Sequence, residues 1–477
     1  MGAVPGREVM NLDGHVTRRI VHGLGAHAYV QFAVIIIQLA GVPILLYAWG
    51  TQLYGAWLIL AAIPTYLSMA DLGFSQSAGN DMTARIARGD VTGALAVFQS
   101  LSALVYGFAT FGVALVAVLL IWLPLGEWLH FAALSTTEVR WILWLLAAEV
   151  LTRLCDGVNH AGFRSHGDYA LHVAINASTM LLQNVAAWTA ALCGAGPVGA
   201  AIALVAVRAF EVPAAAAWLR YRHRDVRFGL AHARADELLR LSKPASANIA
   251  MPVAEAFTNQ GMLLAVGGVL GTAAVVVFSV TRTLANFLLQ LAMLVALPFG
   301  PEIATAWGRA DMEAIKFLFV RMLSSSFVLV LPASTGIYFL GGFILKVWTH
   351  GKVRPDELLL DFFICSVILA GIWKIGIIVL MSVNRHLRSA MSYSFSSIAL
   401  MLAAWFALKQ THHVDVAGFM VLCMNAGMIM FVSGNLRRSL SIDFIEIGRE
   451  AIRTENFVFM FRRVLRVLPH TQSAGDK

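Results

Sequence analysis

The sequence predicts an all-α membrane protein with about twelve membrane-spanning helices. Hydrophobic residues make up 59% of the 477 residues and charged residues only 13%, whereas soluble domains carry roughly 25% charged residues. Apolar runs of about 20 residues, long enough to cross a bilayer as a helix, recur from near Ala28 to near Val432. Helices are the expected element because lipid offers no hydrogen-bond partner to free backbone groups.

The apolar runs place the spans in order along the chain. We expect them at 28–48, 53–70, 94–123, 140–161, 169–192, 197–219, 245–267, 273–298, 316–341, 358–382, 391–408 and 415–434. In this layout, with Lys316 at the edge of its span counted in the adjoining loop, 25 lysines and arginines fall in the loops and ends on one side of the membrane and four on the other. Since short cytoplasmic loops collect positive charge, both termini are expected in the cytoplasm.

The same layout divides the chain into two halves of six spans. The expected parts are a cytoplasmic N-terminus (1–27), a first six-helix bundle (28–219), a basic cytoplasmic linker (220–244), a second six-helix bundle (245–435) and a cytoplasmic tail (436–477). In the tail, apolar residues share one helical face, namely Val458, Phe461, Leu465 and Leu468. This pattern predicts an amphipathic helix lying on the inner membrane surface.

A short internal repeat relates the two halves. Gly50-Thr51 and the pair Arg88 and Asp90 recur 221 positions later as Gly271-Thr272 and the pair Arg309 and Asp311. Such a repeat is the sequence trace of a duplicated transporter. Because each half has an even number of spans, we expect two parallel bundles related by a pseudo-two-fold axis along the membrane normal.

Several other classes of protein are disfavoured. The net charge of +8 is spread over short loops and forms no single patch, so no nucleic-acid partner is expected. The four cysteines lie in or beside apolar segments without metal-ligand spacing, and no phosphate-binding GxxxxGK[ST] loop occurs. The longest expected outer loop, about 342–357, is too short for a catalytic domain. The sequence therefore predicts a transporter, not an enzyme, with no cofactor and no metal.

Two segments carry a resemblance to a known family. Val42 to Asp90 has a Gly-Thr turn after the first span, the exit Asp71-Leu72-Gly73-Phe74 and an Arg-Gly-Asp before the third span, and Gly271 to Asp311 repeats the turn. Both segments resemble the polysaccharide-export and O-antigen flippase family. That family belongs to the multidrug/oligosaccharidyl-lipid/polysaccharide exporter superfamily.

The resemblance implies a fold and a function. It implies two six-helix bundles around a central cavity that opens alternately to each side of the bacterial inner membrane. The implied cargo is an oligosaccharide on undecaprenyl pyrophosphate, flipped to the outer leaflet for surface or exopolysaccharide biosynthesis, with coupling to an ion gradient common in the superfamily. The implied partners are this lipid-linked oligosaccharide and the bilayer, and the resemblance also allows a polysaccharide polymerase and export machinery.

Positive charges inside the spans are the candidate contacts to such a cargo. Each costs at least about 2.5–3.5 kcal/mol in mid-membrane, so it needs a partner, water or a ligand. Arg282 lies near the middle of its span, with no acid in that span and with Asn286 on the same face. Arg282 can hold the pyrophosphate through its planar fork of donors, or it can form an interhelical ion pair. The full set of candidate substrate contacts is Arg282, Lys374, Arg153, Arg208 and Asn286.

Acidic residues inside the spans are candidates for ion coupling, because an embedded carboxyl group can take up and release a proton. The candidates are Glu255, Glu211, Asp156 and Glu149. Each also has a structural alternative. Glu149 with Arg153, and Arg208 with Glu211, have the spacing of helical ion pairs, and Glu255 could pair with Arg282 or with another helix.

Two other transporters remain as alternatives. A multidrug or organic-cation antiporter would share the fold, but its cavity should favour acidic and aromatic residues. A lipid II flippase of the same superfamily typically places arginines in the first two spans, and here those spans contain no Lys or Arg.

Overall fold

The computed structural model describes residues 14–71, 73–125, 131–247 and 249–453, and every regular element in them is helical. The apolar face expected at 458–468 and the first 13 residues lie outside these ranges. The all-α membrane fold expected from composition is confirmed.

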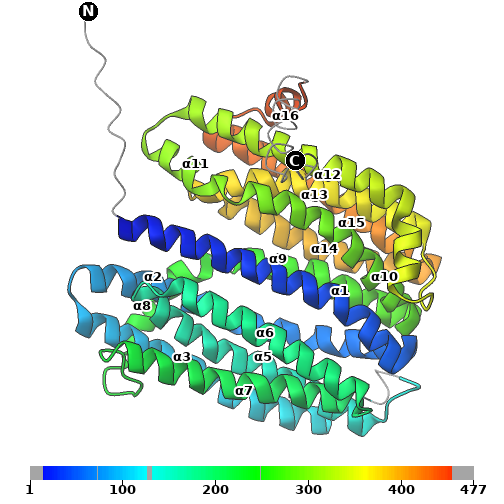
Figure 1. Cartoon of the computed structure of the whole chain (residues 1–477), viewed down its shortest axis with the longest axis horizontal. Coiled ribbons are helices and arrows are strands. Elements are labelled where there is room, and N and C mark those ends of the chain that lie inside the picture. Colours follow the sequence, from blue (N-terminus) through cyan, green and yellow to red (C-terminus); the bar gives the residue numbers. More distant parts are fainter. Residues whose placement is uncertain (1–13, 72, 126–130, 248, 454–477) are drawn as a thin grey trace, which may run out of the picture. The chain divides into compact units, whose positions relative to one another are not determined.

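The long helices of the first half coincide with the expected spans, and shorter helices connect them (Figure 1). They are α1 (Gly14–Thr65), the 3₁₀ helix η1 (Tyr66–Asp71), α2 (Phe74–Ala87), α3 (Val91–Trp122), α5 (Thr136–Ser165), α6 (Tyr169–Leu192), α7 (Gly196–Arg222) and α8 (Ala235–Ala247).

The second half repeats this succession of long and short helices. Its elements are α9 (Ala250–Ala256), the π-helix η2 (Phe257–Gly261), α10 (Met262–Ala296), α11 (Phe299–Gly308), α12 (Met312–Trp348), α13 (Glu357–Ser382), α14 (Leu387–Thr411), α15 (Asp415–Leu440) and α16 (Phe444–Ile452).

Eight helical segments in the described part of the chain are long and apolar enough to cross a membrane. Two of them, Ala28–Ala87 and Ala250–Ala296, each contain two of the expected spans. The spans expected at 140–161 and 169–192 correspond to α5 and α6. These two helices carry more polar residues, and in α5 they include the charged residues Glu149, Arg153 and Asp156. The protein is therefore a multi-pass membrane protein with the expected number of spans.

The backbone conformation explains why Gly50 and Gly271 recur. Gly50 has φ 68° and ψ −179°, and Gly271 has φ 83° and ψ −177°. This region of φ and ψ is almost closed to residues with a Cβ atom. At these two positions the chain leaves helical geometry and starts a new helix, so each glycine separates two spans.

The Asp of each repeat begins the next long helix. The Asp90 carboxylate accepts a hydrogen bond from the Gly93 N–H at 2.8 Å, and the Asp311 carboxylate accepts one from the Ala314 N–H at 2.9 Å. Both are N-caps, which satisfy amide groups that the first helical turn leaves unpaired. The repeat seen in the sequence thus specifies the same turn in both halves.

Contacts between Cα atoms divide the chain into two compact units. Unit 1 comprises 1–48 and 67–246, and unit 2 comprises 49–66 and 247–477. The second part of α1, from Trp49 to Tyr66, therefore groups with the later half of the chain, whereas the span pattern had suggested 28–219 as one bundle. The break at Gly50 allows one continuous stretch of chain to supply a helix to each unit.

Each unit has its own core. In unit 1, α3, α5 and α7 lie side by side (Figure 1) and bury Leu101, Leu151, Val158 and Leu219. In unit 2, α13 packs against α15 and also against α10. There the buried Trp373 donates a hydrogen bond to Asn425 at 2.8 Å. Such polar contacts between helices matter in a membrane protein because lipid cannot satisfy buried polar groups.

Candidate functional site

The first candidate site lies in unit 2, where a π-helix interrupts the run from α9 into α10. A π-turn shifts the backbone hydrogen bonds by one residue, and such turns are frequent at functional sites. The Arg282 guanidinium of α10 donates a hydrogen bond to the carbonyl of Asn259, inside this turn, at 2.7 Å. It also lies over the Phe278 ring, 5.2 Å from the ring centre.

The Asn259 carbonyl and the face of the Phe278 ring thus stabilise the Arg282 guanidinium. Among the residues that the structure describes, no carboxylate lies within 4.0 Å of its guanidinium. Because Arg has five N–H donors, a single carbonyl leaves donors for a further ligand. Asn286 follows one turn later on α10 and is partly exposed.

An ion pair lies in the same unit. Lys374 of α13 donates to Glu255 of α9 at 2.8 Å, and the Lys374 amino group lies 5.6 Å from the centre of the Trp373 ring. The two side chains are 22% and 46% exposed. The acid therefore pairs with another helix and not with Arg282.

A small polar contact continues this region towards α14. Thr258, in the π-helix, lies 2.9 Å from Ser397, hydroxyl to hydroxyl. Phe257, its neighbour, packs edge-on against Tyr66 with ring centres 5.4 Å apart. Neither contact was anticipated from the sequence, because the partners are separated by more than a hundred residues.

Unit 1 holds a second set of the candidate residues in a buried network. Arg208, only 2% exposed, contacts Glu211 at 3.2 Å and Glu149 at 3.7 Å. A third bond runs from the Arg208 guanidinium to the side-chain oxygen of Gln183 at 2.9 Å. Asp156 lies beside this network: its carboxylate is 3.0 Å from His172, and ligand atoms of Asp156, His172 and Glu211 lie within 4.8 Å of one another. Both partners outside the expected set, Gln183 and His172, come from α6.

The helical ion pair expected between Glu149 and Arg153 does not form. Glu149 instead points to Arg208, while Arg153 is exposed on the surface of unit 1. The four-residue spacing allowed the pair, but the buried guanidinium of Arg208 on α7 offers the carboxylate a partner that water does not screen. The i,i+3 pair of Arg208 with Glu211 does form.

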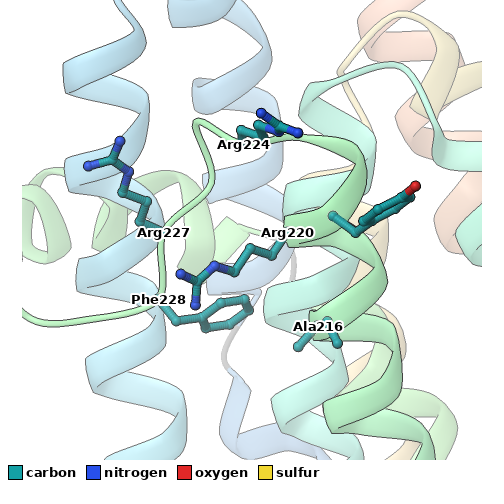
Figure 2. Close-up of a pocket in the computed structure, with 7 residues that line it drawn as sticks. Ala216, Arg220, Arg224, Arg227 and Phe228 are labelled. Atoms are coloured by element: carbon teal, nitrogen blue, oxygen red, sulfur yellow. The ribbon is translucent and has the colours of Figure 1, made fainter.

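A basic pocket lies at the end of α7, where the linker begins. Figure 2 shows its walls, which include Arg220, Arg224 and Arg227 together with Tyr221 and Phe228. Its volume is about 830 Å³. Within the described ranges, none of the three guanidinium groups has a carboxylate within 4.0 Å. The pocket is a surface suited to anions, and it holds three of the seven lysines and arginines of the linker 220–244.

Two solved structures have a fold similar to that of this chain. A multidrug resistance MATE family transporter of the MOP superfamily, in an inward-facing conformation, aligns over 90% of this chain and 96% of its own, with a TM-score of 0.61 and 14% identity. The lipid II flippase MurJ, in an inward closed conformation, aligns over 95% of this chain and 93% of its own, with a TM-score of 0.65 and 10% identity. The protein therefore has the fold of a multi-pass membrane transporter.

The sequence itself gives the family. Residues 98–349, just over half of the chain, match the family described as "Polysaccharide biosynthesis protein", and the chain belongs to that family. No curated protein matches the sequence. The chain is thus a multi-pass membrane protein of a polysaccharide-biosynthesis family, and its fold is shared with membrane transporters.

Proposed function

We propose that the protein moves a polyprenyl-pyrophosphate-linked oligosaccharide from the inner to the outer leaflet of the bacterial inner membrane. The transport supplies surface or exopolysaccharide biosynthesis and proceeds by alternating access, with both termini in the cytoplasm. Family membership supports the link to polysaccharides. The lipid II flippase among the structural neighbours supports a lipid-linked cargo, since it has the same fold.

The observation that carries the proposal is that the groups contacting the Arg282 guanidinium are uncharged. A cation in an apolar segment is retained only if something offsets the free energy of removing it from water. For Arg282 that contribution comes from one carbonyl and one aromatic ring, both uncharged. A pyrophosphate would supply the missing negative charge through charge-assisted, bidentate hydrogen bonds, which the guanidinium geometry favours. Lys374, already paired with Glu255, is the second candidate for this contact.

The same observation weighs against a multidrug antiporter, although such a transporter shares the fold. A site for organic cations needs an acid free of protein cations, and Glu255, on the helix just before the π-turn, is paired with Lys374. A lipid II flippase is the closer alternative because its cargo also carries a pyrophosphate. The identity of the sugar distinguishes the two and can be read from the exported product.

The test is the removal of the Arg282 charge. In cells that depend on this protein for surface glycan, we expect Arg282→Ala to lower export about 10- to 100-fold, from the roughly 1.5–3 kcal/mol of a hydrogen bond to a charged group. Arg282→Lys should retain only part of the export activity, since lysine keeps the positive charge but lacks the planar fork of donors. Membrane abundance and surface glycan are measured together, and cell-wall synthesis is followed in parallel.

A matched control removes another cation that also lies near an aromatic ring. Lys409, at the end of α14, is exposed and lies 3.8 Å from the centre of the Trp405 ring. Lys409→Ala should leave export unchanged. Normal glycan in Arg282→Ala at normal abundance would refute the phosphate contact, and a defect in cell-wall synthesis alone would favour lipid II as the cargo.

Ion coupling is the second part of the proposal. Of the acidic candidates, Glu211 and Asp156 are 7% and 2% exposed and are engaged in the buried network of unit 1, as is Glu149. Glu255 is the most exposed of the four, at 46% of its side chain. We therefore assign proton coupling to Glu255, with Lys374 as the cation that pairs with it when the proton has left.

A further inference from the structure

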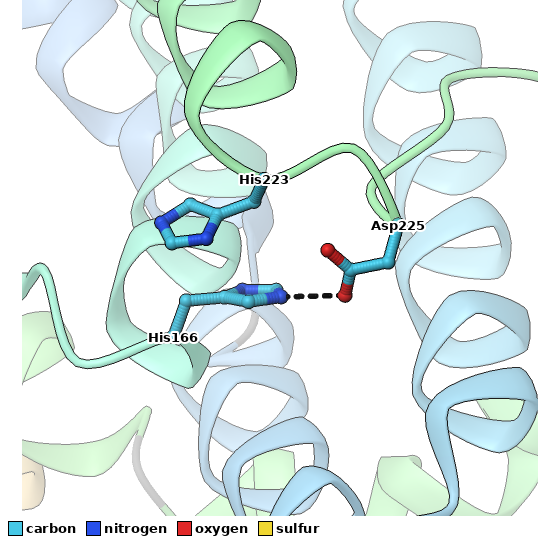
Figure 3. Close-up of side chains that lie close together, drawn as sticks. All are labelled: His166, His223 and Asp225. Atoms are coloured by element: carbon cyan, nitrogen blue, oxygen red, sulfur yellow. Dashed lines mark hydrogen bonds and ion pairs between the residues drawn. The ribbon is translucent and has the colours of Figure 1, made fainter.

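Three side chains gather in unit 1 where α5 and α7 end. His166 follows α5, His223 follows α7 and Asp225 comes two residues later, and Figure 3 shows the two imidazole rings stacked beside the carboxylate. One potential metal-binding atom from each lies within 4.8 Å of those of the other two. No sequence pattern marks this cluster, because 57 residues separate the two histidines.

The hydrogen bonds of His166 fix which of its nitrogens carries the proton. Its Nδ1 lies 2.9 Å from the carbonyl oxygen of Gly162 and 3.0 Å from the hydroxyl of Ser165, which itself donates to the same carbonyl. A carbonyl oxygen only accepts hydrogen bonds, so Nδ1 is the protonated nitrogen. In the neutral imidazole, Nε2 therefore presents a lone pair.

That lone pair faces a second acceptor. The Nε2 of His166 lies 2.8 Å from a carboxylate oxygen of Asp225, the contact drawn as a dashed line in Figure 3. An Asp is ionised near neutral pH, and two acceptors at this distance repel one another. At 2.8 Å the contact is a hydrogen bond from a second ring proton to the carboxylate, and a cation could replace that proton if the two atoms moved to about 3.3 Å apart.

His223 has the complementary arrangement. Its Nε2 lies 2.9 Å from a carboxylate oxygen of Asp168, which also accepts hydrogen bonds from Arg222. The Nε2 of His223 is therefore the donor, and its Nδ1 retains a lone pair. A histidine that binds a metal almost always donates its other ring N–H to a carbonyl or a carboxylate. Both histidines of the cluster have such an outer partner.

We propose that His166, His223 and Asp225 bind a divalent transition-metal ion of the Zn²⁺ class. Imidazole nitrogens and carboxylates are ligands of this class, and three protein ligands leave the fourth tetrahedral position to water. Metal–ligand bonds of about 2.0–2.1 Å require ligand atoms about 3.3 Å apart, which small side-chain rotations achieve here. Exposed fractions of 10%, 19% and 40% for the three side chains leave a route for the ion.

The bound ion would hold the start of the linker in place. His166 belongs to the turn between α5 and α6, while His223 and Asp225 belong to the chain that leaves α7. Coordination would join these segments and hold the start of the linker against α5. The proposed site lies within unit 1, so it does not depend on the role proposed for Arg282 in unit 2.

The experiment uses the full-length chain without a histidine tag, reconstituted in lipid nanodiscs and stripped with chelator. Titration with Co²⁺ and Zn²⁺ should show one ion per chain, with the visible absorption of tetrahedral Co²⁺. His166→Ala and Asp225→Asn should each weaken binding at least about tenfold, and Asp168→Asn, which alters only an outer partner, about 10- to 100-fold. Asp225→His, which supplies a replacement ligand, should retain binding.

His413→Ala removes an exposed histidine elsewhere and should bind the ion as the wild type does. Two outcomes would overturn the proposal. One is the absence of stoichiometric binding in the wild type, which would assign the His166–Asp225 contact to a protonated imidazole. The other is undiminished binding in the combined His166→Ala and Asp225→Asn variant, which would point to the buried group Asp156, His172 and Glu211 as the metal site.

Discussion

At the scale of single residues, the protein keeps arginines in its apolar segments in two different ways. Arg208 is buried among two carboxylates and an amide, so its charge is balanced within unit 1. Among the described residues, the contacts of the Arg282 guanidinium are one carbonyl and one aromatic ring. Removing a partner from the first would strand a buried charge, whereas the second has room for an external anion. We therefore interpret the contacts of Arg208 as structural and the surroundings of Arg282 as a binding site.

The pair of Glu255 with Lys374 can be tested as a coupling element. Glu255→Gln removes titration but keeps size and hydrogen bonding, so we expect transport to lose its dependence on the proton gradient. The rate under a full gradient should fall at least about tenfold, which corresponds to about 1.4 kcal/mol in the barrier. The measurement is glycan export, or flipping in proteoliposomes, with and without an imposed pH gradient.

A double variant separates coupling from structure. If the two side chains only neutralise each other, Glu255→Gln and Lys374→Met should each lower abundance, and the combination should restore both abundance and gradient dependence. Under the coupling proposal, the double variant is inserted normally but stays insensitive to the gradient. Restored gradient dependence would therefore reduce Glu255 to a structural partner.

The sequence could identify the candidate residues but not the residues that they contact. Arg282 and Lys374 stood out because a charge in an apolar run is visible in the sequence. Their surroundings were not visible: the carbonyl that Arg282 binds belongs to a π-turn, and Lys374 and Glu255 lie 119 residues apart. The same limit hid Gln183 and His172, since neutral polar residues in a helix have no distinctive pattern.

At the scale of elements, hydropathy predicted the long helices well because each must present apolar side chains to lipid over its whole length. It did not predict α2 and α11, which are short and follow the kinked helical segments in each half. The repeat does relate them. Gly89 lies two residues after the end of α2 and has φ 79°, and Ala310 lies two residues after the end of α11 and has φ 56°. Both residues are left-handed, although only the first is a glycine.

Close packing at the second part of α1 gives a prediction for unit 2. A Cβ atom on Gly55 would overlap the carbonyl oxygen of Thr272 and lie 2.8 Å from the Cβ of Thr272. Thr272 also donates a hydrogen bond to Gln52, which lies one turn before Gly55 on α1. We expect Gly55→Ala to separate these helices and to cost about 1–3 kcal/mol, as overpacking does in other cores. The measurement is the melting temperature of the purified protein in detergent.

A second glycine provides the control. A Cβ atom on Gly268, in α10, would meet no atom of a neighbouring segment within 4 Å. Gly268→Ala should therefore leave the melting temperature unchanged or raise it slightly, since alanine favours helix over glycine. Equal melting temperatures for Gly55→Ala and the wild type would contradict the close approach of the two segments.

At the scale of the whole molecule, the sequence predicted the helical membrane class and the presence of two similar halves. It could not predict that Trp49–Tyr66 would group with residues 247–477. Chain order suggests bundles made of consecutive spans, and only the spatial contacts of the segment after Gly50 reveal its neighbours. The break at Gly50 makes this grouping possible, because it separates the segment that follows it from the first part of α1.

The orientation of the chain in the membrane is the last property that we predict. With 25 lysines and arginines in loops and ends on one side and four on the other, a fluorescent protein fused after Arg224 or after Arg438 should fluoresce, and one fused near Lys352 should not. Alkaline phosphatase, active only outside the cytoplasm, should give the opposite pattern. Lys352 is the decisive position because the last turn of α12 and the loop that follows it carry three of the four outer charges, Lys346, Lys352 and Arg354. Fluorescence of the Lys352 fusion would invert the predicted topology, and it would also place the basic pocket at the end of α7 on the outer face, away from the leaflet in which a lipid-linked oligosaccharide would be loaded.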